Sequence, residues 1–272
     1  MKKQLTTLLV RPAARGGKYL GPDAANASHQ SALVFLLNPV TEELVAYGVA
    51  DASNPLSAGP ADLMSPVSRS APFATDNKTV QVQLSVDISE PTDFRVLVFG
   101  PLSHPDQARI AQADITVLPG VNIGASPQNP EGLVIEVPGL CISNVQADWQ
   151  SSEVSCFAKV TMMCGCPIRS AVTNPGWFWP DTDFSVQLVT YMQSKAVYYY
   201  TLDFDNTPGV ISSFTGQWPN QAAPNDKVEQ AWIYASEPKL GNQGKYRISP
   251  LFPQLPLRLP PDVQRVILEA GY

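Results

Sequence analysis

The stretch Val80-Gln81-Val82-Gln83-Leu84-Ser85-Val86-Asp87-Ile88 decides the fold. Apolar and polar residues alternate along it almost without a break. A period of two is the period of a β-strand with one buried and one exposed face. The sequence therefore predicts a strand whose buried face carries the apolar residues of this stretch: Val80, Val82, Leu84, Val86 and Ile88.

Other segments of the chain carry strand patterns of similar length. They are 4–10, 32–37, 44–50, 94–99, 109–118, 133–137, 142–149, 153–163, 184–192, 196–204, 210–215 and 228–235. Turn residues such as Asn38-Pro39, Gly100-Pro101 and Pro119-Gly120 separate them. Many short strands with regular turn signals are typical of antiparallel β-sandwiches. The pattern resembles tandem immunoglobulin-like or fibronectin-type sandwiches, which implies an all-β chain, although the Cys-Trp-Cys framework of immunoglobulin domains is missing.

Residues 121–132 contain prolines and glycines and lack a strong strand pattern, while strand patterns flank them on both sides. This composition is typical of a domain boundary. We therefore predict an N-terminal β-sandwich over residues 1–122 and a C-terminal β-sandwich over residues 132–246. Residues 247–272 form a third part, described below.

Composition excludes several classes of protein. The chain has 272 residues, 15% of them charged, with 18 Lys and Arg against 24 Asp and Glu. An acidic balance argues against a nucleic-acid partner, which requires a basic face.

The longest apolar run, residues 32–37, is far shorter than a membrane span of about 20 residues. The first ten residues lack the apolar core and cleavage site of a signal peptide, so the sequence favours a cytoplasmic location.

The C-terminal part is a proline-rich arm that ends in a short helix. Residues 247–261 contain five prolines, which favour extended chain. Pro261-Asp262 then provide a helix start. On that helix Val263, Val266 and Ile267 share one side. Because a helix this short is marginal alone, the apolar side must be covered, either by its own domain or by another subunit.

Four cysteines, Cys141, Cys156, Cys164 and Cys166, lie within one short region. If residues 154–166 form one regular strand, Cys156, Cys164, Cys166 and Met162 share an inward face and Met163 lies on the other. The thiols then act as small core hydrophobes. Alternatively, Cys164 and Cys166 bind a soft transition metal together with Met162 or Met163.

Two further uses of the thiols stay open. Cys141 and Cys156 could form a disulfide between neighbouring strands, although the location predicted above disfavours one. A nucleophilic cysteine would need a nearby base. The only histidines of the chain are His29 and His104, both far from the cysteines in sequence.

Residues 167–183 form a long connection with no clear strand or helix pattern, and such loops are more often functional than short ones. The loop carries Trp177-Phe178-Trp179, with Arg169 and Asp181 on either side. We expect one tryptophan to fold into the core and the other to make contacts, since aromatic residues dominate interface hot spots.

The sequence favours a non-enzymatic binding or assembly protein that contacts its own copies or a protein partner through the arm and the 167–183 loop. Sparse charge leaves a neutral surface that suits an interface. The alternative is a metal- or thiol-dependent protein, possibly an enzyme, that uses Cys164 and Cys166 with Arg169 and Asp181. A carbohydrate-binding module is a third possibility, based on the loop aromatics. The residues identify no substrate and leave open whether the chain is an enzyme.

Overall fold

The structure is a computed structural model that describes residues 2–20, 31–50, 80–124, 132–223, 225–248 and 259–272. Within these ranges the chain is all-β apart from one α-helix and one 3-10 turn. It divides into two compact units. Unit 1 comprises Met1–Pro138 and Pro256–Tyr272, and unit 2 comprises Gly139–Leu255.

Unit 1 contains two β-sheets and the helix. Its elements are β1 (Gln4–Ala14), β2 (Leu33–Leu37), β3 (Leu44–Val49), β4 (Val82–Ile88), β5 (Thr92–Gly100), β6 (Arg109–Val117), β7 (Leu133–Val137) and α1 (Pro261–Glu269). One sheet has the order β4-β1-β7 and the other the order β3-β2-β5-β6. Strand β1 is antiparallel to β4 and parallel to β7.

The alternating stretch that opened the sequence analysis forms β4, as predicted. Val82, Leu84 and Val86 are buried, whereas the residues between them are exposed. The strand pairs with β1 over its whole length, from Gln4 opposite Ile88 to Val10 opposite Val82. The period of two thus places one face of this sheet in the core of unit 1.

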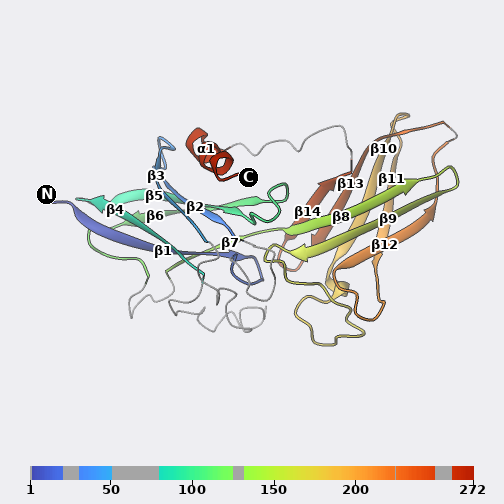
Figure 1. The fold of residues 1–272 in the computed structure, drawn as a ribbon, viewed down its shortest axis with the longest axis horizontal. Helices are drawn as coiled ribbons and strands as arrows, with labels where there is room; N and C mark the ends of the chain where they lie inside the picture. The colour runs from blue at the N-terminus through green and yellow to red at the C-terminus, as the bar shows by residue number, and fades with distance from the viewer. Residues whose placement is uncertain (1, 21–30, 51–79, 125–131, 224, 249–258) are drawn as a thin grey trace. The chain divides into compact units, whose positions relative to one another are not determined.

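Strand β2 (LVFLL) is buried at every position, because both of its faces are covered. Leu33, Phe35 and Leu37 form one hydrophobic cluster with residues of β5 and with the apolar side of α1. Figure 1 shows α1 beside the sheet that contains β2, β3 and β5. A continuous apolar run is typical of a strand with two buried faces.

Unit 2 contains one long sheet that is bent. Its elements are β8 (Leu140–Trp149), β9 (Glu153–Met162), the 3-10 turn η2 (Asp181–Asp183), β10 (Ser185–Met192), β11 (Val197–Phe204), β12 (Ser213–Pro219), β13 (Val228–Glu237) and β14 (Asn242–Arg247). The strand order is β14-β13-β10-β11-β12-β9-β8. Strands β11 and β12 pair at only two positions, so the sheet is weakly held there and its two halves can fold over one another.

One face of the bent sheet is buried along β9, β10, β11 and β13, as the two-residue period requires. The ends of the sheet also approach each other. A side chain on Gly244 of β14 would lie 2.8 Å from the carbonyl oxygen of Leu140 in β8. Glycine permits this close contact because it has no Cβ. The buried faces of the two halves therefore enclose the core of unit 2.

The division into units differs from the predicted ranges 1–122, 132–246 and 247–272. Strand β7, predicted to open the second sandwich, pairs instead with β1, from Val10 opposite Leu133 to Ala14 opposite Val137. The helix predicted to end a separate arm packs into the cluster of unit 1. Both differences have one cause: the partner of each element is distant in sequence, and the local pattern does not identify it.

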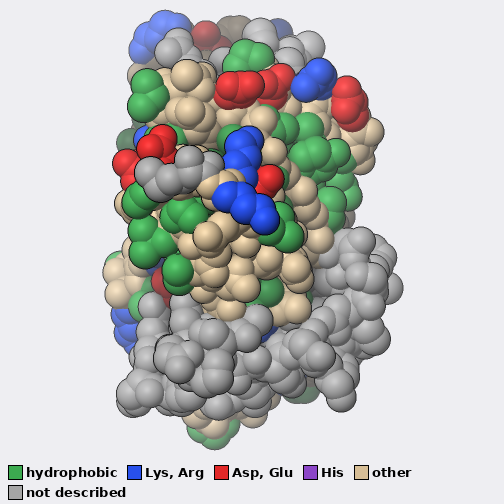
Figure 2. Space-filling model, turned by 90° about the vertical axis from the view of Figure 1, so that its left-hand side faces the viewer, with side chains coloured by type: hydrophobic (Ala, Val, Ile, Leu, Met, Phe, Trp, Pro, Cys, Tyr) green, Lys and Arg blue, Asp and Glu red, His purple; other side chains and the backbone are tan. Residues whose placement is uncertain are grey.

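No helix within the described ranges is long and apolar enough to cross a membrane. Figure 2 shows acidic, basic and hydrophobic side chains interspersed on one face of the molecule. The described residues on that face form no extended patch of a single charge, in keeping with the low share of charged residues in the sequence.

Candidate functional site

The cysteine-bearing strand β9 has the inward face that the sequence predicts. Val154, Cys156, Ala158, Val160 and Met162 are buried and alternate with half-buried residues. Cys156 is 4% exposed. The strand is central to its half of the sheet, between β8 and β12, so its inward side chains meet the core of unit 2.

The predicted alternation fails after Met162, where the strand ends in a tight turn. The amide of Gly165 donates to the carbonyl of Met162 at 2.8 Å, and the amide of Met162 donates to the carbonyl of Cys166 at 3.1 Å. Gly165 has a φ of 75°, which glycine adopts without strain. The turn buries Met163 completely, so placing Met163 on the opposite, outward face was wrong.

None of the four cysteines, all of which lie in described ranges, forms a disulfide. The bridge considered between Cys141 and Cys156 is not formed, because the register pairs Cys141 with Thr161 and Cys156 with Ala147. The Cys141 thiol instead donates to the Met163 sulfur at 3.5 Å. His104 belongs to unit 1, whereas the cysteines belong to unit 2, and His29 lies outside the described residues.

Burial raises the pKa of the Cys156 thiol from 9.0 to about 12. A thiol with such a pKa is a poor nucleophile at neutral pH. Among the described residues, no three His, Cys, Asp or Glu side chains come together as metal ligands. The metal set of Cys164, Cys166, Met162 and Met163 stays a prediction, while Cys156 fits its role as a core residue.

The 167–183 loop is folded around its aromatic residues. Trp179 is 4% exposed, whereas Trp177 and Phe178 are half-buried. The Trp177 indole N–H donates to the carbonyl of Pro167 at 2.9 Å, and the guanidinium of Arg169 lies 4.4 Å from the Trp177 ring centroid. The core position of Trp179 agrees with the sequence analysis, and the contact role of Trp177 and Phe178 stays a prediction.

Asp181 fixes the shape of this loop. Its carboxylate accepts a hydrogen bond from the amide of Ala171 at 2.6 Å, and its own amide donates to the carbonyl of Arg169 at 2.9 Å. The amide of Arg169 in turn donates to the carbonyl of Trp179 at 3.1 Å. In this structure Asp181 and Arg169 act on the loop itself, and they hold the aromatic cluster in place.

The three helix residues proposed for docking are covered by their own chain. Val263 is fully buried, and Val266 and Ile267 are 7% exposed in the cluster of unit 1. The sequence left open whether this side packs on its own domain or on another subunit. The structure places it against unit 1, so these side chains are not accessible to a partner while the helix is seated.

Among the described residues of unit 2, the largest set of exposed aromatic side chains lies on the outer face of β14-β13-β10-β11. We call Tyr191, Tyr199 and Tyr234, together with Trp232, the tyrosine face. Tyr199 is 67% exposed, Tyr234 38% and Tyr191 36%. Strand β10 lies between the other two strands, so the rings share one surface of three hydrogen-bonded strands.

The register brings these rings together around β10. Val189 pairs with Tyr199 on one side and with Trp232 on the other, and it is only 3% exposed although it points outward. The Trp232 and Tyr234 rings stack with centroids 6.3 Å apart. Partial burial, and then the nearby Tyr191 hydroxyl, raise the pKa of Tyr234. The rings thus form an aromatic patch on one surface of the sheet.

Charged side chains flank the tyrosine face on opposite sides. On β14, the Lys245 ammonium and the Arg247 guanidinium lie 5.9 Å and 5.4 Å from the Trp232 ring centroid, a distance at which a cation is attracted to a ring. On β11, Asp203 is exposed at the other side. The sequence signalled part of this face, because consecutive tyrosines on a strand must point to opposite sides, but it did not indicate which strands are neighbours.

No protein-family model matches the chain, and a search of curated proteins finds no match. Among solved structures, a DUF3823 family protein from Bacteroides ovatus is 10% identical with a TM-score of 0.30, over 89% of this chain and 96% of that chain. A DUF3823 family protein from Parabacteroides merdae is 10% identical with a TM-score of 0.23, over 90% and 99%. Likeness this low carries no argument about family or function.

Proposed function

We propose that the chain is a non-enzymatic binding protein that assembles with a second copy of itself through the tyrosine face. The observation that carries the proposal is the exposed aromatic patch on a hydrogen-bonded sheet. Tyrosine and tryptophan are enriched at protein interfaces. In this proposal the tyrosine face replaces the helix α1 as the contact surface, because unit 1 covers the apolar side of α1.

The charges beside the tyrosine face are self-complementary. A dimer with two-fold symmetry brings the same patch of both copies together. If the axis lies in the interface and runs parallel to the strands along the middle of the face, β11 of one copy lies opposite β14 of the other. Asp203 then meets Lys245 of the second copy, twice in each dimer. This arrangement supports a second copy as the partner.

The strand order supports a finer proposal about fold type. In unit 2, β8, β9 and β12 form one half of the sheet, and β11, β10, β13 and β14 form the other. We infer that both units are sandwiches of the immunoglobulin or fibronectin kind, since three-against-four Greek-key arrangements are typical of these folds. Such scaffolds host many functions, so the dimer proposal depends on the tyrosine face alone.

Light scattering coupled to size exclusion, over a range of protein concentrations, tests the assembly. We expect the full chain to approach twice its 29.4 kDa mass as concentration rises. Tyr199→Thr with Tyr234→Thr should return it to the monomer mass, and threonine retains the strand preference of both sites. Tyr272→Thr removes an exposed tyrosine at the C-terminus and should leave the mass unchanged.

A charge exchange tests the two-fold geometry. Lys245→Glu alone and Asp203→Lys alone should each weaken the dimer, because like charges then face each other. The double variant should restore association by exchanging the two charges. A monomer at every concentration would contradict the proposal. So would a dimer that all these variants leave intact.

A further inference from the structure

A pocket of about 430 Å³ opens at one end of unit 2. Its aromatic lining comes from Trp149 at the end of β8 and from Tyr198 and Tyr200 on β11. Between β12 and β13, Asn220 and residues 222, 223 and 225–227 add to the wall. The volume lies within the range of small-molecule pockets, which combine an apolar lining with a few placed polar groups.

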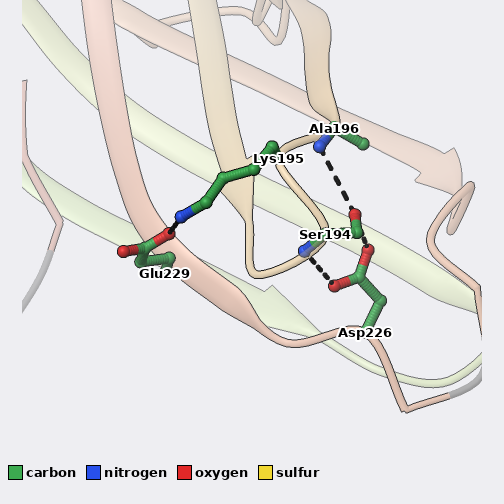
Figure 3. Close-up of polar contacts among 5 residues, drawn as sticks. All are labelled: Ser194, Lys195, Ala196, Asp226 and Glu229. Carbon is green, nitrogen blue, oxygen red and sulfur yellow. Dashed lines mark hydrogen bonds and ion pairs between the residues drawn. The ribbon is translucent and has the colours of Figure 1, made fainter.

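The wall on the β10 side is held by Asp226. Its carboxylate accepts hydrogen bonds from the Ser194 amide at 3.1 Å and from the Ser194 hydroxyl at 2.5 Å. Figure 3 shows these contacts, together with the ion pair at 3.1 Å between Lys195 and Glu229. The amide of Gln193 also donates to the carbonyl of Lys227 at 2.9 Å. The β10–β11 turn is therefore joined to residues 226–229 at several points.

The opposite wall is held by Asn220. Its amide side chain donates to the carbonyl of Gln150 at 2.7 Å, and its backbone amide donates to the carbonyl of Ser152 at 3.0 Å. The Tyr198 hydroxyl donates to the carbonyl of Gln221 at 3.1 Å. These bonds exist without a ligand, so the pocket is formed in advance and binding does not have to order it.

One polar group of the pocket lining has no hydrogen-bond partner in the described part of the chain. This group is the Trp149 indole N–H, which is buried and unpartnered. Trp149 lines the pocket. An unmet buried donor costs free energy, so a ligand that supplies an acceptor here gains affinity that a purely apolar ligand does not.

We infer that this pocket binds a neutral saccharide. A sugar ring has an apolar C–H face that fits an aromatic lining, and hydroxyls at its edge that can accept a hydrogen bond from the Trp149 N–H. A quaternary ammonium ion would also fit three aromatic rings and a carboxylate. Such a cation has no acceptor for the Trp149 N–H, and the Asp226 carboxylate is already engaged by Ser194.

Titration calorimetry on the full chain tests the inference, with neutral oligosaccharides of hexoses, pentoses and N-acetylhexosamines as probes and tetramethylammonium chloride as the cationic comparison. We expect saturable binding of at least one saccharide class and none of tetramethylammonium. Trp149→Phe keeps an aromatic ring at this site but removes the N–H. It should weaken saccharide binding by about 10-fold or more.

The matched control is Trp177→Phe, which makes the same change in the 167–183 loop at a residue that does not line the pocket, and it should leave saccharide affinity unchanged. Thermal unfolding of each variant separates lost binding from lost folding. Three results would overturn the inference: no saturable binding of any saccharide, saccharide affinity that Trp149→Phe leaves unchanged, or binding of tetramethylammonium instead. The dimer proposal is tested at the tyrosine face and can fail separately.

Discussion

At the scale of single residues, burial decides what Cys156 can do. It is 4% exposed on the inner face of β9, and burial raises the pKa of its thiol to about 12. At pH 8 a thiol with that pKa is ionised in on the order of one molecule in 10⁴, against about one in ten for an unshifted thiol. The folded protein therefore presents Cys156 as an unreactive core side chain.

We predict that iodoacetamide at pH 8 leaves Cys156 unmodified in the folded chain and modifies it rapidly in denaturant, as peptide mass spectrometry can show. Because the pKa of this thiol is higher in the folded chain than in the unfolded chain, the stability that its burial provides is fully present below pH 9. That stability is lost as pH rises from 9 towards 12, because the unfolded chain then releases the thiol proton and the folded chain retains it. Cys156→Ala should therefore flatten the fall in unfolding free energy over that range. Rapid labelling of the folded protein would refute this account.

The sequence predicted part of the candidate site at this scale. The alternation along β9 correctly placed Cys156 and Met162 inward, and Trp179 lies in the core as one tryptophan was expected to. Met163 was misplaced because the two-residue period applies only while the strand continues. The turn around Gly165 ends the strand, and the direction of a side chain in a turn depends on backbone angles that a periodicity does not contain.

At the scale of elements, α1 is stabilised by the sheet beneath it rather than by itself. Its nine residues are too few for an independent helix in water. Val263, Val266 and Ile267 pack with Leu33, Phe35 and other residues of the cluster in unit 1. The helix therefore needs the sheet for its stability, and the sheet needs the helix to cover its apolar side chains.

We predict that Ile267→Ala lowers the unfolding free energy by about 2–4 kcal/mol, because it leaves a cavity in a packed cluster. The adjacent Leu268 is 72% exposed and provides a matched control. Leu268→Ala should change stability by no more than about 0.5 kcal/mol. Denaturant titration followed by circular dichroism measures both. Equal effects of the two substitutions would show that the helix is not seated on unit 1.

Most strands were predictable because apolar residues alternate along them, and β14 was missed because its buried positions are not hydrophobic. Asn242 is fully buried and Gly244 faces inward. The Asn242 side chain accepts from the amide of Gly139 at 3.0 Å and donates to the Glu237 carboxylate at 3.1 Å. A strand whose inner face is held by hydrogen bonds gives no hydrophobic period for sequence analysis to detect.

At the scale of the whole molecule, the chain leaves unit 1 after β7 and returns to it with α1, so unit 2 is inserted between two parts of unit 1. The sequence predicted three consecutive parts instead. Local composition cannot reveal an insertion, because the evidence for it is the parallel pairing of β7 with β1 and the packing of α1 on β2 and β5. Both contacts join residues more than 100 positions apart.

An insertion has a consequence that consecutive domains would not have. Residues 139–248 contain every strand of unit 2, and we predict that this fragment folds alone with a cooperative thermal transition. Residues 1–138 lack α1 and expose Phe35 and its neighbours. Burying the three apolar side chains of α1 is worth about 5–9 kcal/mol, comparable to the whole stability of a typical domain, about 5–15 kcal/mol.

The fragment 1–138 should therefore unfold at a much lower temperature than unit 1 in the full chain, or aggregate. A fusion of residues 1–138 to residues 259–272 through a flexible linker should recover the lost stability, since α1 requires only its own sheet. The same fusion with Ile267→Asp should not recover it, because a carboxylate would then be buried in an apolar cluster. If residues 1–138 alone melted cooperatively at the temperature of the fusion, α1 would be an addition to a complete domain, and unit 2 would not be an insertion in any energetic sense.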